Sequence, residues 1–353
     1  PHQSSAASDV YKRQGEGRQV SLRGLGAGFT HVTLNGMEVP ASTGGLDSSG
    51  GVNRGRGFDF NVFSAELFNR IDVNKAARAS LEEGGIAGSV DLYTLKPLDR
   101  AGFNSSVSAQ LGYSDLSEEV DPRLTATISG TNEDQTFGYM VSAAYTERTS
   151  FQDGFGTVRW AQPDRDFAAN TVLNGVDLRE VWFPRLPRQD SFRHEQDRLG
   201  LSAGLQFRPN DDLDIGINWV HSEFDSTTNS YNSFAQFRRS GDYGYPAITP
   251  NSVVLDSTGQ IALAGNFDGV GLRTESRQSL DVTDFDQYTI DFDYQLNNNM
   301  SLSGMVGTAS SDYQNDQFRV NIQTPTGANF SYDFTGNQDV AAIDYDIDVT
   351  SVN

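Results

Sequence analysis

Two arginines and a set of aromatic residues are the side chains whose types and spacing best suit the binding of a ligand. The arginines stand in a glycine-rich stretch, and guanidinium groups pair with carboxylate or phosphate oxygens. The aromatics lie in long polar segments, where ring faces beside polar groups suit sugars or aromatic ligands. The candidates for ligand contact are Arg54, Arg56, Trp160, Trp182, Phe183, Tyr243 and Tyr245. Two other uses stay open: ion pairing of the arginines with carboxylates of the protein, which we favour, and packing or membrane-interface roles for the aromatics.

Catalytic and metal-binding patterns are missing from the sequence. The four histidines, His2, His31, His194 and His221, are scattered, and there is no cysteine. No H-E-x-x-H, G-x-S-x-G, phosphate-binding loop or dinucleotide fingerprint occurs. Aspartates gather at 281–293 and 344–348, but without the glycine of a calcium loop, so we interpret them as solvated or lumen-facing carboxylates. We therefore predict no enzyme, no metal site and no cofactor.

The composition narrows the class of partner. Asp and Glu number 47 against 26 Lys and Arg, giving a formal net charge of -21. Nucleic-acid binding needs clustered basic residues, so we expect no nucleic-acid partner. Only 37% of the residues are hydrophobic, and no run approaches the roughly 18 apolar residues of a membrane helix. Barrel strands need only about 10 residues with one apolar face, so a membrane protein built of strands stays possible.

From residue 103 onward, apolar and polar residues alternate with a period of two, which predicts strands with one apolar face. The clearest run sets Leu199, Leu201 and Leu205 on one face against Arg198, Ser202 and Gln206 on the other. Seven such runs occur, at about 103–113, 124–129, 137–145, 198–208, 213–219, 288–295 and 300–306.

The connections between these runs alternate in length. Tight polar turns are expected at 132–135, 209–212 and 297–299, and a modest link at 114–121. The other connections are long, at about 150–197, 226–284 and 311–353. Outer-membrane barrels alternate short periplasmic turns with long extracellular loops, whereas a soluble sandwich has no reason to do so. The pattern therefore favours a membrane barrel with long extracellular loops.

Four motifs before these strands carry a family resemblance. Ser21–Gly26 reads S-L-R-G-L-G, and Val32–Val39 reads V-T-L-N-G-M-E-V; R-I-D-V-N-K comes next at 70–75 and E-G-G-I-A-G-S-V-D-L-Y-T at 83–94. In this order the runs resemble the plug motifs of TonB-dependent outer-membrane receptors, over about Val20 to Arg148. The residues that match the plug motif are Arg23, Gly24, Asn35, Gly36, Lys75, Gly84, Gly85 and Gly88.

The resemblance implies a transmembrane antiparallel β-barrel preceded by a small α+β plug domain. We expect residues 15–98 to be a partial plug and 99–353 the N-terminal portion of the barrel, with about seven strands present of roughly 22. Residues 1–14 have neither the apolar core of a signal peptide nor the composition of residues 15–98, so we expect a non-native head. The family's signal peptide, TonB box and first plug half are not recognisable here.

The resemblance also implies a function. The chain is expected to be part of a ligand-gated, plugged barrel in the bacterial outer membrane that imports a scarce solute with energy from TonB and its inner-membrane motor complex. The solute is siderophore-bound iron or an oligosaccharide; the run from Asn35 to Phe63 looks most like a subgroup that takes up oligosaccharides. The partners would be TonB, the small solute and outer-membrane lipid. The alternative is a passive porin or adhesin-type barrel without TonB coupling.

Overall fold

Strands and single turns of 3-10 helix are the regular elements of the part of the chain that the structure describes. The computed structural model describes residues 8–13, 16–40, 43–44, 55–76, 85–162, 172–237, 240–336 and 340–347. Over these residues no helix is both long enough and apolar enough to cross a membrane. The chain divides into two compact units, the first of residues 1–150, 194–227 and 279–317, and the second of 151–193, 228–278 and 318–353.

The N-terminal part of the first unit holds a small mixed sheet. It consists of β3 (Thr30–Leu34), β4 (Met37–Glu38), β5 (Arg70–Asn74) and β6 (Gly88–Tyr93) in the order β4-β3-β6-β5. β3 and β6 run parallel, and the other pairs are antiparallel. Val32, Leu34, Val90 and Leu92 lie in one buried cluster, which explains why these short apolar runs become strands. The small α+β unit expected from the sequence is therefore present.

A hairpin and four 3-10 turns complete this domain, which we call the plug. The hairpin pairs β1 (Ser8–Arg13) with β2 (Glu16–Leu22). β1 therefore lies within residues 1–14, the segment that we expected to be non-native. The turns are η1 (Ala27–Phe29), η2 (Phe60–Val62), η3 (Ala65–Leu67) and η4 (Pro97–Asp99). The sequence predicts one or two helical turns at 64–69 with Ser64 as N-cap; Ser64 is the N-cap of η3, without a side-chain capping bond.

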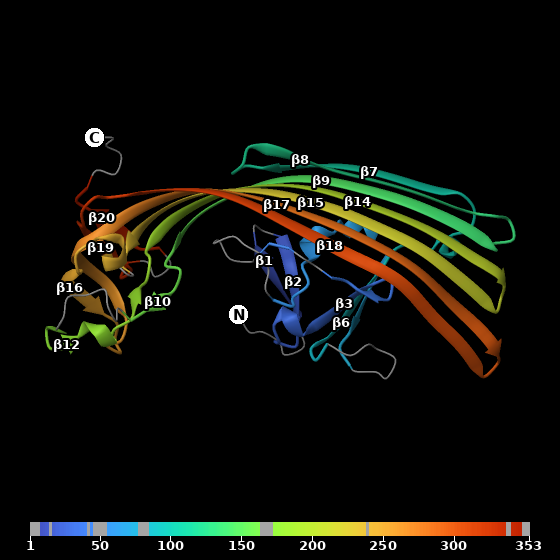
Figure 1. Cartoon of the computed structure of the whole chain (residues 1–353), viewed down its shortest axis with the longest axis horizontal. Coiled ribbons are helices and arrows are strands. Elements are labelled where there is room, and N and C mark those ends of the chain that lie inside the picture. Colours follow the sequence, from blue (N-terminus) through green and yellow to red (C-terminus); the bar gives the residue numbers. More distant parts are fainter. Residues whose placement is uncertain are drawn as a thin grey trace. The chain divides into compact units, whose positions relative to one another are not determined.

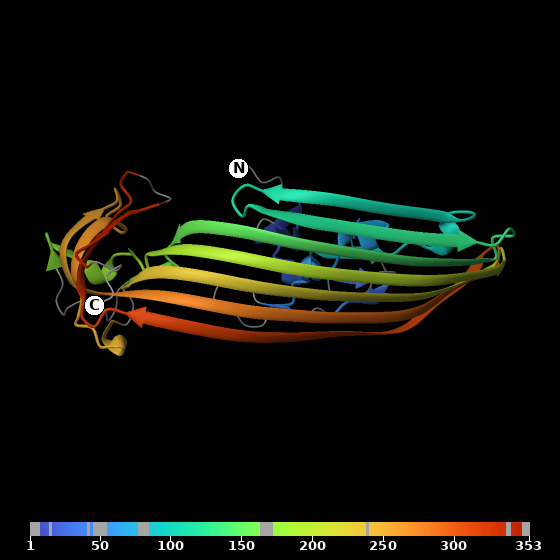
Figure 2. The ribbon, with the colours of Figure 1, turned by 90° about the horizontal axis from the view of Figure 1, so that it is seen from above.

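The larger sheet contains seven long strands, as the alternation predicts. They are β7 (Asn104–Ser114), β8 (Glu119–Thr131), β9 (Phe137–Gly156), β14 (Arg188–Asn210), β15 (Leu213–Gln236), β17 (Ala262–Asn297) and β18 (Met300–Gln323). Each pairs with the next in this series, and they lie side by side in Figures 1 and 2. The pairing is antiparallel, and in the first unit the plug lies against one face of these strands (Figure 1). This confirms an antiparallel sheet preceded by a plug.

The tight turns lie where the sequence places them, but the strands are longer than the alternation indicates. β8 ends at Thr131 and β9 begins at Phe137, and only two residues separate β14 from β15 and β17 from β18. At their other ends the strands enter the segments that were expected to be loops: β9 reaches Gly156, and β14 already begins at Arg188. In β9 and β14 the extra residues are mostly polar, with only Phe151, Phe155 and Phe192 as large apolar side chains, so little hydrophobic contrast marks them as strand.

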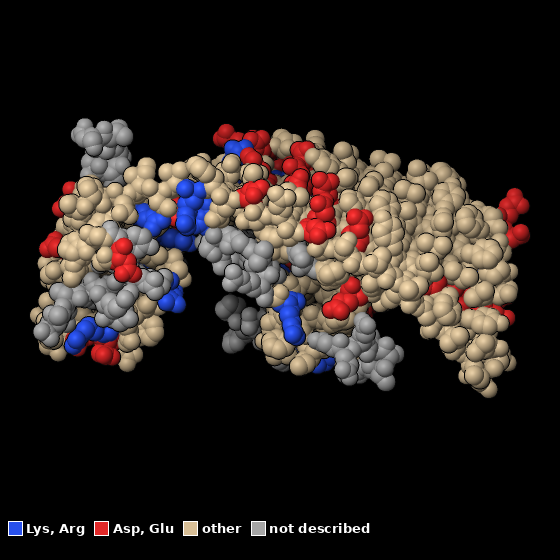
Figure 3. Space-filling view, viewed as in Figure 1, with Lys and Arg blue, Asp and Glu red and all other residues tan. Residues whose placement is uncertain are grey.

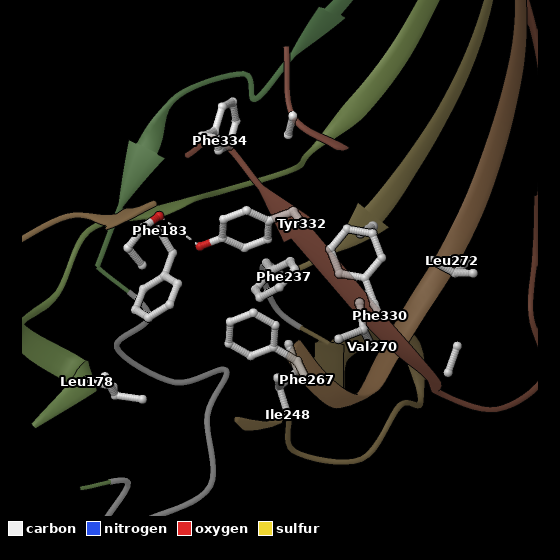
Figure 4. Packing of buried hydrophobic residues seen from close by; sticks show 14 of the residues in the cluster. Leu178, Phe183, Phe237, Ile248, Phe267, Val270, Leu272, Phe330, Tyr332 and Phe334 are labelled. Carbon is white, nitrogen blue, oxygen red and sulfur yellow. Dashed lines mark hydrogen bonds between the residues drawn. The ribbon is translucent and has the colours of Figure 1, made fainter. Parts of the chain in front are cut away.

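The second unit adds short strands and an aromatic core. The short strands are β10 (Trp160–Ala161), β11 (Val172–Leu173), β12 (Val176–Asp177), β13 (Phe183–Pro184), β16 (Thr249–Leu255), β19 (Ala328–Asp333) and β20 (Ala342–Tyr345), with the 3-10 turns η5 (Leu178–Glu180) and η6 (Ser240–Tyr243). In the core, the Phe237 ring meets the Phe267 ring edge-on, with ring centroids 4.9 Å apart. The Tyr332 ring stacks on the Phe267 ring, with centroids 5.9 Å apart (Figure 4). The hydroxyl of Tyr332 donates to the carbonyl of Ala262 at 3.0 Å, so the buried phenol keeps a partner.

Candidate functional site

The plug-motif glycines lie where the backbone turns with positive φ. Arg23 and Gly24 have φ of 56° and 71°, and Asn35 and Gly36 have 49° and 82°. Two successive positive φ values define the tight hairpin turn that favours Asn-Gly. The Asn35 side-chain oxygen also accepts hydrogen bonds from Thr94 N at 3.0 Å and Thr94 Oγ1 at 3.2 Å, which ties this turn to the residue after β6. The motif is therefore structural at these four positions.

The later motif residues lie beside the start of β6. Gly88 has φ of +139°, and a Cβ there would stand 2.5 Å from the carbonyl oxygen of Asn74. A Cβ on Gly85 would meet the Gly88 carbonyl oxygen at 2.3 Å, so both positions need glycine. Lys75 is exposed just beyond β5, and Gly84 lies outside the described residues.

A buried ion pair fixes the segment of the plug that faces the large sheet. Arg18 on β2 donates through Nε to Asp59 Oδ2 at 2.8 Å, and the two side chains are only 7% and 2% exposed. Asp59 in turn accepts from the backbone N of Asn61 at 3.0 Å and caps η2. Because a buried charge is stable only with such partners, this pair holds η2 in place.

We give the name docking contacts to the hydrogen bonds that Arg198, Ser222 and Gln206 of the large sheet make with the plug. Arg198 of β14 donates to the Asn61 carbonyl oxygen at 2.6 Å and to Asn61 Oδ1 at 2.8 Å. Ser222 of β15 donates through Oγ to the carbonyl oxygen of Val62 at 2.6 Å. Gln206 of β14 accepts from Leu98 N at 2.9 Å. Polar side chains of the sheet thus satisfy backbone groups of the plug that burial removes from water.

Apolar contacts lie between the docking contacts. Phe63 of the plug meets Phe285 of β17 edge-on, with ring centroids 4.9 Å apart. Gly200 of β14 leaves room for Leu67, since a Cβ there would lie 2.6 Å from Leu67 Cδ1. The described interface therefore combines hydrogen bonds with aromatic and aliphatic packing. Among the described residues no group of three His, Cys, Asp or Glu side chains is placed to hold a metal.

The two faces of the large sheet in the first unit have inverted polarity. The face covered by the plug carries buried polar side chains, among them Arg198, Ser202, Gln206, Ser222, Gln287 and Thr289. The opposite face exposes large apolar side chains, among them Val107, Leu124, Val141, Leu205, Ile217, Ile290 and Leu302. A sheet folded in water would bury its apolar face instead.

The exposed apolar face forms a band of limited height. In β9 it runs from Phe137 to Tyr145, and in β14 from Leu199 to Phe207, about nine residues in each strand. Beyond the band the same face turns acidic, with Glu147, Asp197, Asp225, Asp284 and Asp286. Figure 3 shows acidic side chains gathered part-way along the long strands, beside a broad uncharged region. About 9–11 residues is the length of a strand that crosses a bilayer.

Amphipathic aromatics mark the acidic border of this band. The Trp219 and Tyr288 rings stack with their centroids 6.4 Å apart, and Trp219 Nε1 donates a hydrogen bond to Asp286 Oδ1 at 3.2 Å. His221 Nδ1 lies 3.2 Å from the same carboxylate oxygen. Rings with one apolar and one polar side are typical of the boundary between lipid and water.

The predicted ligand-contact residues fall into both units. In the first unit Arg56 is exposed on the plug, and Arg54 lies outside the described residues. In the second unit Trp182 is 44% exposed and Trp160 half-buried, whereas Phe183 and Tyr245 are only 2% and 6% exposed. The Tyr245 hydroxyl donates to the carbonyl of Thr324 at 3.0 Å; the Tyr243 side chain lies outside the described residues. Among the predicted aromatics whose side chains are described, Trp182 is therefore exposed and Trp160 is partly exposed.

Sequence reasoning did not single out the docking contacts. Arg198, Gln206 and Ser222 are polar members of an alternating run, and in the sequence they are equivalent to any residue of the polar face. The one available signal was that they include an Arg and a Gln among small residues, which indicates a face covered by protein.

Comparison with known proteins bears on the N-terminal part of the chain. Residues 4–90 match the family model described as the TonB-dependent receptor plug domain. The matched range includes β1, so it overlaps residues 1–14. No curated protein matches the chain.

The similar solved structures are receptors of low sequence identity. The siderophore receptor PirA from Acinetobacter baumannii is 10% identical over 89% of this chain and 52% of its own, with a TM-score of 0.31. The alcaligin outer-membrane receptor FauA from Bordetella pertussis is 14% identical over 98% of this chain and 56% of its own, with a TM-score of 0.30. The ferric enterobactin receptor PfeA is 12% identical over 93% of this chain and 56% of its own, with a TM-score of 0.33. The chain thus spans about half the length of these receptors, and scores of this size carry no argument about its ligand.

Proposed function

We propose that this chain belongs to a gated importer of the bacterial outer membrane, because residues 4–90 match the TonB-dependent receptor plug domain and the described part of the plug packs against an antiparallel sheet. The sheet is the N-terminal portion of the barrel wall, and residues 99–353 supply it. The observation that carries the proposal is the inverted polarity of the sheet: its polar face is buried under the plug, and its apolar band faces outward. That arrangement fits a wall with lipid outside and a polar, plugged lumen inside.

In this proposal the plug closes the lumen until energy from the inner membrane moves it. TonB and its motor complex are the partners that the plug domain implies. The docking contacts are among the interactions that this movement must break. The cargo is a scarce solute, siderophore-bound iron or an oligosaccharide. The candidates for contact with it are Arg56 and Trp182, which are exposed, and Trp160, which is half-buried.

Short turns at one end of the strands and long segments at the other set the orientation. In this proposal the turns at 132–136, 211–212 and 298–299 belong to the periplasmic side, and the opposite ends of the same strands belong to the extracellular side. A passive porin or an adhesin-type barrel is the alternative, and the plug argues against a permanently open pore.

Conductance across a planar bilayer distinguishes these functions. We expect the protein that carries this chain to insert into the bilayer and to conduct almost no ions, because the plug fills the lumen. We also expect the purified periplasmic domain of TonB to bind it. A steady ohmic current in the unmodified protein, with no binding of that domain, would establish the porin alternative instead.

A further inference from the structure

Three arginines of the second unit converge on one glutamate. Arg273, Glu275 and Arg277 alternate along β17, and Arg319 lies on the neighbouring strand β18. The Arg277 guanidinium lies 2.5 Å from the Glu275 carboxylate, that of Arg273 at 3.4 Å and that of Arg319 at 3.9 Å. We call these four residues the basic cluster.

Positive charge outnumbers negative charge within the basic cluster. Three guanidinium groups face one carboxylate there, in a chain whose net charge is -21. The Glu275, Arg273 and Arg277 side chains are 8%, 13% and 10% exposed, so water screens them poorly. Arg319 is different: its side chain is 49% exposed and reaches Glu275 only at 3.9 Å. Its guanidinium is therefore the least buried positive charge of the basic cluster.

The basic cluster lies on the polar face of its strands. The neighbours of Arg319 in β18, Phe318 and Val320, expose 68% and 42% of their surface on the opposite face. On the side of the cluster, Asn321 Oδ1 accepts from Arg273 Nε at 3.1 Å, and the Phe234 ring lies 5.4 Å from the Arg273 guanidinium. These contacts hold the Arg273 guanidinium in one orientation, which lowers the entropy lost when it binds an anion.

A cavity of about 410 Å³ adjoins the basic cluster. Arg273 lines it together with Phe234, Phe330, Ile343 and Tyr345, and the amides of Gln189 and Gln323 contribute polar groups. This volume falls within the range of small-molecule sites, roughly 300–1,000 Å³. An apolar cavity with a guanidinium group at its wall suits a solute that has a neutral body and an anionic group.

We propose that the basic cluster binds a carboxylate or phosphate group of the imported solute, while the adjoining cavity holds the neutral body of that solute. The inference rests on the proposed function and narrows its cargo to an anionic solute. Glu275 keeps the arginines together when no solute is bound and competes with the solute for them. A Glu275 that competes with the solute and a Glu275 that is purely structural therefore predict opposite changes in anion affinity when its charge is removed.

Titration calorimetry on the protein in detergent micelles tests this. The probes are trigalacturonate, its fully methyl-esterified and therefore neutral form, and inorganic pyrophosphate as an anion without a sugar. We expect at least one of the two anions to bind roughly tenfold or more tighter than the ester, since a charge-assisted hydrogen bond has about that effect. Binding should weaken as salt is raised.

Three variants separate ligand binding from folding. Arg319→Gln should weaken anion binding roughly tenfold. Glu275→Gln should strengthen it, because the competing carboxylate is lost, whereas a purely structural Glu275 predicts weaker binding. Arg179→Gln is the matched control: Arg179 is also in the second unit, its side chain is 46% exposed, and it pairs with Asp177. Equal anion affinity in the Arg319 and Arg179 variants, or equal affinity for anions and ester, would overturn the proposal. Either result leaves the bilayer conductance and TonB binding unaffected, so the receptor function is judged separately.

Discussion

Replacing Arg198 with alanine should release the plug from the wall. The side chain is buried at 8% exposure and makes two charge-assisted hydrogen bonds to Asn61, at 2.6 and 2.8 Å. Each such bond contributes about 1.5–3 kcal/mol, and Asn61 is left buried with two unsatisfied acceptors. Because the two bonds share both residues they do not add fully, and we expect about 3 kcal/mol in total. The population with an undocked plug should therefore rise about 100-fold.

The chain has no cysteine, so a single introduced thiol reports on undocking. Val62→Cys places the thiol at a position that is 2% exposed, directly beside the docking contacts, and its alkylation rate tracks the undocked fraction. We expect Arg198→Ala to raise that rate about 100-fold. Arg208→Ala is the control on the same strand, since Arg208 pairs with Asp214 near the turn, and it should change the rate by less than about twofold. Similar rates for the two variants would refute the role of Arg198.

Asn61→Ala completes a double-mutant cycle. Alone it removes the 2.8 Å bond, and in the Arg198→Ala background it should have little further effect. Fully additive rate changes would mean that Arg198 acts on the fold of the wall and not through Asn61.

Three further predictions concern local stability. Hydrogen bonds from Thr258, Ile261 and Gln260 lower the pKa of Asp256 to about 2. Because the pKa in the folded state lies below that in the unfolded state, the stabilisation is complete above about pH 4 and is lost towards pH 2. Amide exchange at residues 260–261, corrected for its intrinsic rate, should therefore lose protection between these pH values in the unmodified protein and not in the Asp256→Asn variant. Gly88→Ala should destabilise the plug by at least about 1–3 kcal/mol in denaturant unfolding, because φ is +139° and the new Cβ would stand 2.5 Å from a carbonyl oxygen; Gly24→Ala, with open space around it, should cost less. Tyr332→Phe should lower the stability of the second unit by about 1–3 kcal/mol, because it leaves the Ala262 carbonyl without the phenol at 3.0 Å; an unchanged thermal midpoint would argue against that bond.

The sequence predicts the strands of the band well, because their two faces differ in polarity. Val141 beside Ser142 and Leu201 beside Ser202 give an alternation that survives folding, since one neighbour meets the plug and the other stays on the opposite face. The turns are equally predictable from the sequence, since short polar runs such as Asn297–Asn299 interrupt the alternation.

The remaining parts of the fold have no such contrast. β14 from Arg188 to Asp197 and β15 beyond Ser226 carry polar residues on both faces, so only pairing with a neighbour makes them strands. The candidate ligand residues show a related limit. In the sequence Phe183 and Tyr245 are candidates for ligand contact. In the structure their side chains are buried inside the second unit, because a long aromatic segment can form its own core.

If the chain is part of a membrane importer, the apolar band of the first unit faces lipid, and a nitroxide scan of β9 tests this most directly. Single spin labels at 139 to 143, in protein reconstituted in bilayers, would be measured for contact with oxygen, which enters lipid, and with a water-soluble nickel chelate. We predict a period of two: labels replacing Tyr139, Val141 and Ala143 meet oxygen and not nickel, and labels at Met140 and Ser142 are shielded from both. Strong nickel contact at 139, 141 and 143 would mean that this face lies in water, and the proposed importer function would fail.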